Sequence, residues 1–240
     1  KPCARGTQRA EWLSPRDLVF MATKKLQRSI PRHFEVVLSA FGLILVSPVL
    51  LISVLLIKLG SRGPIFFRQD RVGLNGRTFK LIKLRTMSIS GIGPRITAAN
   101  DSRVTPIGKI LRRSKVDELP ELWNVLRGDM SFVGPRPEVI EFVDLDDPVW
   151  QEILTHRPGI TDPVTLRLRN EEQLLAKVAD KERYYREVVQ PYKLRGYLNF
   201  VRDKSWKTDI RIGARTVRAV AFPATVKPPS KEEMKWSFAE

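Results

Sequence analysis

The apolar and polar positions divide this chain into one long hydrophobic run and a mixed remainder. The run covers Val36–Ile57 and contains no charged side chain. A straight helix over this range would be about 33 Å long, enough to cross the hydrocarbon core of a bilayer. Ser47-Pro48 lies in its middle, and Pro48 has no N–H to donate to Ile44, so the pattern predicts a kink there.

Basic side chains flank this run on both sides, at Lys24, Lys25, Arg28 and Arg32 before it and at Lys58, Arg62, Arg68 and Arg71 after it. Positive charge beside an apolar helix marks the cytoplasmic side of a membrane. We therefore expect both ends to be cytoplasmic and the helix to turn back at Ser47-Pro48 as a re-entrant hairpin. A kinked helix that spans the bilayer is the alternative, because transmembrane helices tolerate proline.

The segment before the run also has a helical pattern. Ser14-Pro15 is typical of a helix start, and apolar and basic residues alternate from there to Arg28. This pattern predicts an amphipathic helix lying on a membrane surface. An ordinary surface helix fits the same residues equally well.

After the run the pattern changes to that of a β-hairpin. Strand-like segments at Ile65–Gln69 and Thr78–Lys83 flank Asn75-Gly76. Asn-Gly is a strong hairpin-turn signal, because both turn residues need positive φ. Gly73 and Gly76 do not have the spacing of a nucleotide-binding loop, so we interpret them as turn residues.

Helical spacing returns in the second half of the chain. Thr105-Pro106 predicts a helix start, and apolar residues between Leu119 and Leu126 predict a second helix that ends at Gly128. Beyond these we expect a strand at 167–169, a helix over 170–179 and a last helix over 205–221.

Together these elements predict an α+β fold, in which a re-entrant membrane helix hairpin joins a cytoplasmic globular domain with a small β-hairpin or sheet and several helices. The expected segments are an N-terminal loop and interfacial helix at 1–33, the membrane helix at 34–60, the globular domain at 61–222 and a loosely held tail at 223–240.

The charge balance narrows the choice of partners. The formal net charge of +16 favours an anionic partner, such as anionic lipid, a phosphorylated substrate or nucleic acid. Cys3 is the sole cysteine, which excludes an intrachain disulfide and fits a reducing compartment, and no Cys/His cluster has zinc spacing. The chain begins at Lys1 without a signal peptide, so we expect a fragment or a processed form.

Two adjacent carboxylates, Asp117 and Glu118, are the centre of the candidate chemistry. Pro120 is tolerated only in the first turn of its helix, so both carboxylates lie at or just before the helix N-terminus, where the dipole favours negative charge. Cationic residues surround them in sequence, at Arg112, Arg113 and Lys115 upstream and at Arg136 in the rigid Gly134-Pro135-Arg136-Pro137 turn downstream.

These residue types suit phosphoryl transfer. Arginine binds phosphate oxygens bidentately, one carboxylate can attack phosphorus, and another can hold a divalent metal. A structural ion-pair network has the same composition, so the spacing leaves both interpretations open.

From about Phe34 to Thr216 the chain resembles the bacterial sugar transferase family, the monotopic polyprenyl-phosphate phosphoglycosyl transferases. The matching features are the apolar run with Ser47-Pro48, FFRQDRVG at 66–73, the strand end KLRTM at 83–87, SKVDELPELWNVLRGDMSFVGPRPE at 114–138 and RPGIT at 157–161. A long ordered series is far more specific than any single short motif.

The resemblance implies an enzyme of the bacterial inner membrane whose catalytic domain lies on the cytoplasmic face of the phospholipid bilayer. It implies transfer of a sugar 1-phosphate from a UDP-sugar to undecaprenyl phosphate with Mg²⁺, releasing UMP. This would be the first membrane step in assembling an exopolysaccharide, O-antigen or capsule. A homodimer is compatible with the resemblance, and no nucleic acid is expected.

The resemblance also assigns roles to residues. Asp117 would be the nucleophile that forms an acyl-phosphate with the sugar phosphate, and Glu118 would bind Mg²⁺ or assist the lipid phosphate; both are candidate Mg²⁺ ligands. The family's strand-end lysine matches Lys80 or Lys83. The other candidate substrate-binding residues are Arg85, Arg112, Pro135, Arg136, Arg157 and Asp180.

The chain departs from the family pattern after RPGIT, where Asp162-Pro163 stands in place of the family's glycine. Thr165–Asn170 also differs from the usual sequence. These differences concern the sugar or uridine contacts rather than the transfer chemistry. A non-catalytic membrane-surface scaffold is the alternative function, and nucleic-acid binding ranks last because it does not explain Val36–Ile57.

Overall fold

The apolar run lies within one continuous helix, α2 (Arg32–Gly60). The computed structural model describes residues 29–88, 99 and 101–235, and the helix predicted over 14–28 lies outside them. Pro48 is inside α2, and the Ser47 hydroxyl donates to the Ile44 carbonyl oxygen at 2.7 Å. Pro48 has no N–H to donate to this oxygen, so the Ser47 hydroxyl replaces the missing hydrogen bond.

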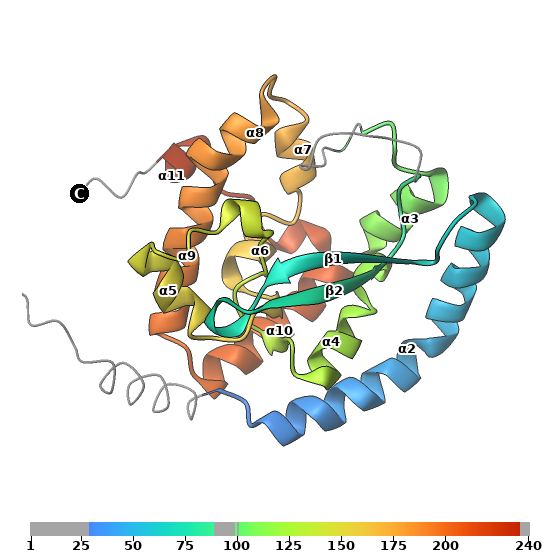
Figure 1. Cartoon of the computed structure of the whole chain (residues 1–240), viewed down its shortest axis with the longest axis horizontal. Helices are drawn as coiled ribbons and strands as arrows, with labels where there is room; N and C mark the ends of the chain where they lie inside the picture. Colours follow the sequence, from blue (N-terminus) through green and yellow to red (C-terminus); the bar gives the residue numbers. More distant parts are fainter. Residues whose placement is uncertain (1–28, 89–98, 100, 236–240) are drawn as a thin grey trace, which may run out of the picture.

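Figure 1 shows α2 bending around the lower and right-hand sides of the globular part. It is an unbroken bent helix and does not fold into two antiparallel halves. By length and composition α2 could cross a membrane.

One side of α2 packs on the globular part. Glu35, Ser39, Ser53 and Ile57 are buried there, and their helical spacing puts them on the same side of the helix. The other sides carry exposed large apolar side chains, at Phe34, Val37, Leu38, Phe41, Ile44, Leu45, Val49, Leu51, Ile52, Leu55, Leu56 and Leu59. So long an exposed apolar surface is what a helix embedded in lipid presents.

The predicted hairpin is confirmed. Strands β1 (Phe66–Val72) and β2 (Thr78–Leu84) pair antiparallel, with Phe66 opposite Leu84 and Val72 opposite Thr78. The short helical turn η1 (Leu74–Gly76) joins them. Asn75 has φ 54° and Gly76 has φ 74°, as the Asn-Gly pair requires.

A second, small sheet was not predicted. β3 (Ser131–Val133) and β4 (Gly159–Thr161) pair parallel, although they lie far apart in the sequence. A Cβ atom on Gly159 would lie only 2.0 Å from the Gly134 nitrogen, so glycine permits this close approach. The fold is therefore a mixed α+β arrangement with one long apolar helix and two small sheets.

The two helices predicted around the carboxylates are confirmed. Thr105 caps α3 (Pro106–Ser114) by accepting from the Gly108 N–H. The short α4 (Glu121–Arg127) ends at Gly128, which has φ 95°. The start of α3 at Thr105-Pro106 and the end of α4 at Gly128 thus lie where the sequence predicted them.

Most of the remaining chain is helical. It contains η3 (Ile140–Phe142), α5 (Pro148–Leu154), α6 (Pro163–Arg167), α7 (Glu171–Leu175), α8 (Lys181–Tyr184), η4 (Tyr185–Val189), α9 (Gln190–Arg202), α10 (Trp206–Ala221), η5 (Pro223–Thr225) and α11 (Lys231–Lys235). The strand predicted at 167–169 is wrong: Asp162 caps α6 by accepting from the N–H groups of Val164 and Thr165, the helix ends at Arg167, and a turn follows. The helix predicted over 170–179 is reduced to α7.

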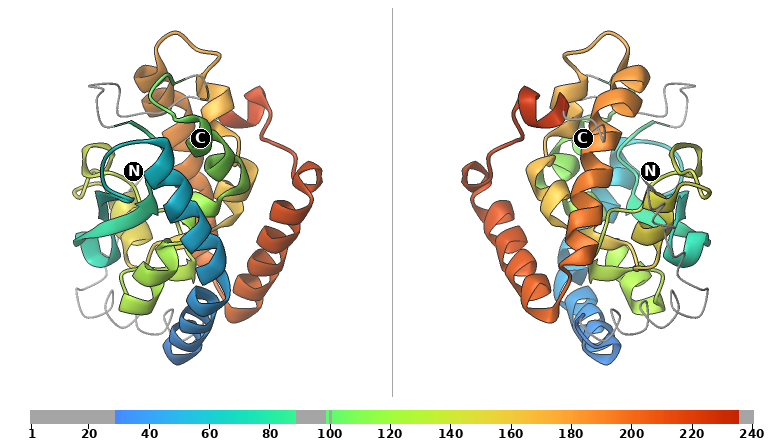
Figure 2. Two further views of the ribbon diagram at one scale, coloured as in Figure 1. Left: turned by 90° about the vertical axis from the view of Figure 1, so that its right-hand side faces the viewer. Right: turned by 90° about the vertical axis from the view of Figure 1, so that its left-hand side faces the viewer.

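The helix predicted over 205–221 is confirmed as α10. Ser205 and Thr208 form a reciprocal capping box at its start. Its inner side buries Ile212 and Ala219, and its outer side exposes Trp206, Ile210, Val217 and Val220. Figure 2 shows α10 along the outside of the molecule, away from the hairpin.

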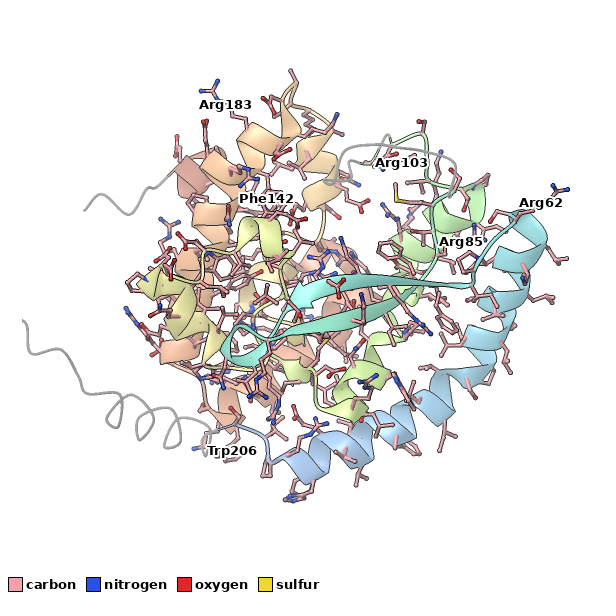
Figure 3. All side chains as sticks on the ribbon, in the orientation of Figure 1. Arg62, Arg85, Arg103, Phe142, Arg183 and Trp206 are labelled. Carbon is pink, nitrogen blue, oxygen red and sulfur yellow. The ribbon has the colours of Figure 1, made fainter. Side chains whose placement is uncertain are left out.

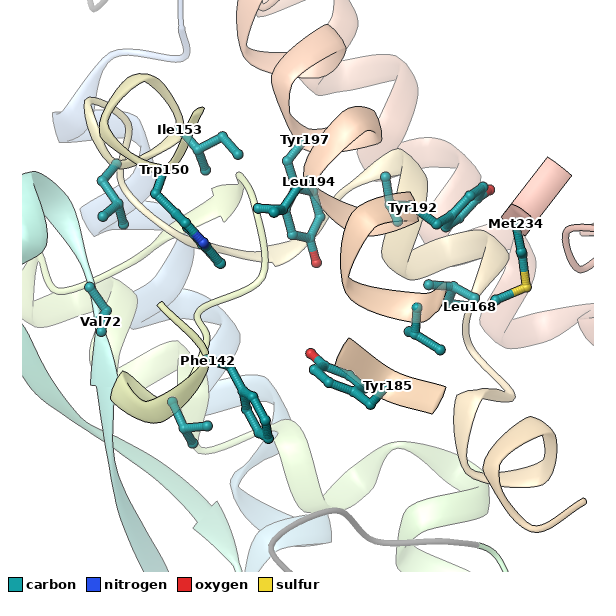
Figure 4. Close-up of a cluster of buried hydrophobic side chains, with 14 of the residues drawn as sticks. Val72, Phe142, Trp150, Ile153, Leu168, Tyr185, Tyr192, Leu194, Tyr197 and Met234 are labelled. Carbon is teal, nitrogen blue, oxygen red and sulfur yellow. The ribbon is translucent and has the colours of Figure 1, made fainter. Parts of the chain in front are cut away.

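The largest hydrophobic cluster joins α5, η4 and α9 to the β-hairpin and to α11 (Figure 4). Its members include Val72, Trp150, Tyr185, Tyr197 and Met234. Met234 is 2% exposed. The prediction of a loosely held tail is therefore wrong for the residues of α11, which pack against α9.

Candidate active site

A left-handed residue between two helices sets the position of the adjacent carboxylates. Lys115 has φ 59° and ψ 17°, which ends α3 and reverses the chain. The single helical turn η2 (Val116–Glu118) follows and leads through Pro120 into α4. Asp117 and Glu118 therefore lie just before the α4 N-terminus, as predicted.

Asp117 has a buried carboxylate with an uncommitted oxygen. Its side chain belongs to a residue only 8% exposed, and Oδ1 accepts no hydrogen bond from any residue that the structure describes. Burial and the neighbouring charge of Glu118 raise the pKa of Asp117, while Lys83, Lys115 and Arg112 oppose that rise. An oxygen in this state is available to a ligand or to a reacting atom.

Glu118 is held by cations from three different elements. Lys83 of β2 donates to Oε1 at 3.1 Å, Arg136 donates to both carboxylate oxygens, and Lys115 Nζ lies 4.0 Å from Oε1. Although burial favours the neutral form, Arg136, Lys83 and Lys115 hold the pKa of Glu118 well below its usual range. Glu118 is therefore ionised throughout the physiological range.

Sequence reasoning missed a third carboxylate, Glu121. It is 1% exposed, and its Oε1 lies 3.1 Å from the Lys83 ammonium. Burial raises the pKa of Glu121, and the positive charge of Lys83 opposes this rise. The signal that could have found it is its position three residues after Glu118, which puts both on one side of a helical turn.

Arg136 comes from a turn that contacts from β4 and from β1 of the hairpin hold in place. The Gly159 N–H donates to the Pro135 carbonyl oxygen at 2.9 Å, and Arg71 donates to the Pro137 carbonyl oxygen at 3.0 Å. Pro135 therefore contributes backbone geometry here, and the side chain of Arg136 reaches Glu118.

Arg112 approaches the site from the last turn of α3. Its Nε donates to the Thr86 hydroxyl and its Nη1 to Glu172, each at 2.9 Å. Its positive charge acts on Asp117 and lowers the pKa of that carboxyl. Neither Thr86 nor Glu172 was predicted as a partner of Arg112.

The structure separates the two candidate lysines. Lys83 points into the carboxylate cluster, whereas Lys80 is exposed and pairs with Asp70 at 2.7 Å on the hairpin. They are three residues apart on β2, and side chains at odd spacings point to opposite faces of a strand. Lys83 is thus the strand residue that joins the candidate site.

Three other predicted residues have different surroundings. Arg85 is buried and donates to the carbonyl oxygens of Ser61, Arg62 and Pro64, so it fixes the chain just after α2. Figure 3 shows Arg62 directed outward from this end, with Arg85 on the inner side.

Arg157 and Asp180 lie on elements other than η2 and β2. Arg157 Nε donates to the Gly128 carbonyl oxygen at 3.2 Å, behind the end of α4. Asp180 is exposed and caps α8 through the Arg183 N–H. Among the described contacts, none joins Arg157 or Asp180 to Asp117 or Glu118.

A metal ion would find only part of its coordination in the protein. No group of three or more His, Cys, Asp or Glu side chains forms a metal site within residues 29–88, 99 and 101–235. Mg²⁺ is usually bound by one or two carboxylates together with substrate phosphates and water. The free Oδ1 of Asp117 beside Glu118 fits such partial coordination.

The cluster as a whole can attract and bind an anion next to the Asp117 carboxylate. Lys83, Lys115 and Arg112 act on Asp117, whose Oδ1 has no partner among the described residues, and Arg136 holds the adjacent Glu118. Guanidinium groups bind phosphate oxygens, and the nearby carboxylate can attack phosphorus.

Comparison with known proteins gives one family. The family described as bacterial sugar transferase matches residues 26–223 of the chain. The chain is also 45% identical over 141 residues to a UDP-glucose:undecaprenyl-phosphate glucose-1-phosphate transferase of Caulobacter vibrioides. That alignment covers 57% of this chain and 53% of the Caulobacter protein.

Two further relatives show the same similarity. The exopolysaccharide production protein ExoY of Rhizobium meliloti is 37% identical over 170 residues, which cover 64% of this chain and 75% of ExoY. A UDP-glucose:undecaprenyl-phosphate glucose-1-phosphate transferase of Escherichia coli is 36% identical over 175 residues, which cover 70% of this chain and 38% of that protein. The chain thus spans about half or less of the two glucose-1-phosphate transferases and most of ExoY.

Proposed function

Because the chain belongs to the bacterial sugar transferase family, we propose that it transfers a sugar 1-phosphate from a UDP-sugar to undecaprenyl phosphate and releases UMP. The observation that carries the proposal is the buried Asp117 Oδ1, which is uncommitted among the described residues and surrounded by cations. The names of the relatives from Caulobacter and Escherichia supply the donor and acceptor classes.

The first step is attack by Asp117 on the sugar-side phosphorus of the donor. A bond forms between a carboxylate oxygen and that phosphorus, and the bond from phosphorus to the bridging oxygen of the diphosphate breaks. UMP leaves with the electron pair of the broken bond, and Asp117 carries an acyl-linked sugar phosphate. Lys83, Arg112 and Arg136 stabilise the negative charge of the phosphates during this step.

The second step returns Asp117 to its starting state. An oxygen of undecaprenyl phosphate attacks the same phosphorus, and the acyl-phosphate bond breaks with its electron pair going back to the carboxylate. The product is an undecaprenyl diphosphate sugar. The covalent step lets a soluble donor and a lipid acceptor use one nucleophile in succession.

Mg²⁺, when bound, would neutralise phosphate charge during the transfer. Asp117 and Glu118 are the residues that would hold it, together with the phosphates of the substrate. Lys83 and Arg136 already form ion pairs with Glu118, so Mg²⁺ would compete with these two cations for the Glu118 carboxylate.

We also propose that α2 enters the bilayer and returns to the face from which it came. Near the start of α2, Arg32 donates to the Leu126 carbonyl oxygen at 3.2 Å, and the Phe132 N–H donates to Glu35 at 3.2 Å. At its end, Ile57 packs with Leu84 and Leu111.

Both ends of α2 are thus attached to one globular body, which favours placing them on the same side of a membrane. The exposed apolar side chains of α2 would face lipid. In a bacterial cell this membrane would be the inner membrane, with the globular part on the cytoplasmic face, where UDP-sugars are available.

The deciding experiment is a panel of UDP-sugars incubated with membranes that contain the protein and undecaprenyl phosphate. UMP release that depends on the lipid acceptor, from at least one donor, is the expected result. Binding of the protein to liposomes without UMP release from any donor would instead support a membrane-surface scaffold.

A further inference from the structure

Arg112 is held by a residue 60 positions further along the chain and outside the motif that contains the carboxylates. Its Nη1 donates to Glu172 Oε1 and its Nε to the Thr86 hydroxyl, both at 2.9 Å. Thr86 is itself fixed, because its carbonyl oxygen accepts from the Thr105 N–H at 3.0 Å. Two of the three guanidinium nitrogens are therefore occupied by protein groups.

The third guanidinium nitrogen of Arg112, Nη2, has no hydrogen-bond partner among the residues that the structure describes. Arg112 also acts electrostatically on the buried carboxylate of Asp117. A guanidinium fixed at two nitrogens, whose third nitrogen meets no hydrogen-bond partner in the described part of the chain, is arranged to bind an anion with little loss of side-chain freedom.

Glu172 can serve as a fixed support because α7 is attached on both sides. The Glu172 carbonyl oxygen accepts from the Ala99 N–H at 2.9 Å. The preceding residue, Glu171, pairs with the buried Lys193 at 2.8 Å.

Lys193 connects α7 to the turn that carries Arg136. It donates to the Tyr185 hydroxyl at 3.2 Å, and Tyr185 in turn donates to Glu138. A series of polar contacts thus runs from α7 to the segment just after Arg136. From α7, Glu172 therefore contacts Arg112 directly, and the contacts that start at Glu171 end at Glu138, two residues after Arg136.

We propose that Glu172 is a positioning residue that orients Arg112 toward the diphosphate of the nucleotide donor. The inference rests on the proposed function, in which Arg112 binds donor phosphate. Glu172 supplies geometry rather than charge, since its own negative charge would repel the donor. Its side chain is 46% exposed, so it does not act as a buried structural ion pair.

The test is a double-mutant cycle of Arg112 and Glu172, in which the affinity for UDP is measured. UDP is the probe because every candidate donor contains it. The full chain in detergent is titrated with UDP in the presence of Mg²⁺. We expect Glu172→Ala and Arg112→Ala each to weaken binding about tenfold, and Glu172→Gln, which keeps an acceptor oxygen, to stay within about threefold of the wild type. The double variant Arg112→Ala/Glu172→Ala should bind no more weakly than Arg112→Ala, because Glu172 acts through Arg112.

Glu187→Ala is the matched control. Glu187 pairs with Arg183 Nε at the same 2.9 Å on the surface of the molecule, and its removal changes the net charge by the same amount. We expect this variant to bind UDP like the wild type. Melting temperatures without ligand check that each variant is folded.

Four results would overturn the proposal, and three of them concern Glu172→Ala. Glu172→Ala could bind like the Glu187 control, it could bind more tightly because Glu172 competes with phosphate, or its effect could add fully to that of Arg112→Ala. A wild type that binds no UDP would overturn it as well. A wild type that binds UDP but releases no UMP from the donor panel would contradict the proposed function alone, and the cycle would still decide the role of Glu172.

Discussion

The ammonium of Lys83 lies 3.1 Å from Glu118, although 35 residues separate them in the sequence. The same ammonium lies 3.1 Å from Glu121. One cation from the β-hairpin is therefore shared by two carboxylates that precede and begin α4. This contact joins the end of β2 to the segment that contains Asp117.

Replacing Lys83 should impair UMP release far more than replacing Lys80. Lys83→Ala removes a cation from the carboxylate cluster and should lower the rate by about 100-fold. Lys80→Ala removes an exposed pair with Asp70 and should change the rate by less than about threefold.

The assay for this pair is UMP release at saturating donor. Lys83→Arg retains the positive charge and should keep more activity than Lys83→Ala, which separates the charge effect from a folding defect. A larger loss in Lys80→Ala than in Lys83→Ala would contradict the assignment of Lys83 to the site.

Replacing Asp117 should abolish the covalent step. Asp117→Asn keeps the shape of the side chain and removes the nucleophilic carboxylate, so UMP release should fall by at least about a thousandfold. Intact-protein mass spectrometry with donor alone should detect a sugar-phosphate adduct on the wild type and none on the variant. Unchanged UMP release by Asp117→Asn would sink the proposed mechanism.

The buried Asp117 should cost stability at neutral pH. Burial raises the folded-state pKa of Asp117, so ionising this carboxyl costs more free energy in the folded protein than in the unfolded chain. The stability present below the unfolded pKa of an aspartate, about 3.9, is lost as pH rises through the raised folded pKa. Asp117→Asn, which is always neutral, should therefore melt at a higher temperature than the wild type at pH 7.

Thermal melts in EDTA at a series of pH values measure this effect without bound metal. The gap between Asp117→Asn and the wild type should narrow as the pH falls toward the ordinary aspartate pKa. A gap that is constant with pH would show that the carboxylate charge is not its cause.

Both ends of α2 should be accessible from the same side of the membrane. Cysteines introduced at Arg32 and Arg62, in turn, should react with a membrane-impermeant thiol reagent only when the cytoplasmic face is exposed. A cysteine at Leu45, within the exposed apolar part of α2, should react from neither side. Labelling of either end from outside intact cells would instead indicate a helix that spans the bilayer.

Local signals predicted the elements around the carboxylates because each acts over a few residues. Asn75-Gly76 supplies the positive φ of the hairpin turn, Thr105 caps α3, and Gly128 ends α4. Where a longer-range contact mattered, prediction failed. Burial of Met234 fixed the segment expected to be loose. One failure was local: the pattern missed the Asp162 cap two residues before Val164, so α6 and the turn after it stand where a strand was expected at 167–169.

The sequence by itself determined the long apolar helix and the adjacent position of Asp117 and Glu118, because both depend on residues that are neighbours along the chain. It left the choice between Lys80 and Lys83 open, it placed Glu121 near Glu118 without pairing it with Lys83, and it did not indicate Glu172 as a partner of Arg112. Only the tertiary structure decided these points, since residues 35 or 60 positions apart meet only through packing. Strand alternation turned Lys83 toward the carboxylates, and α7 brought Glu172 to Arg112.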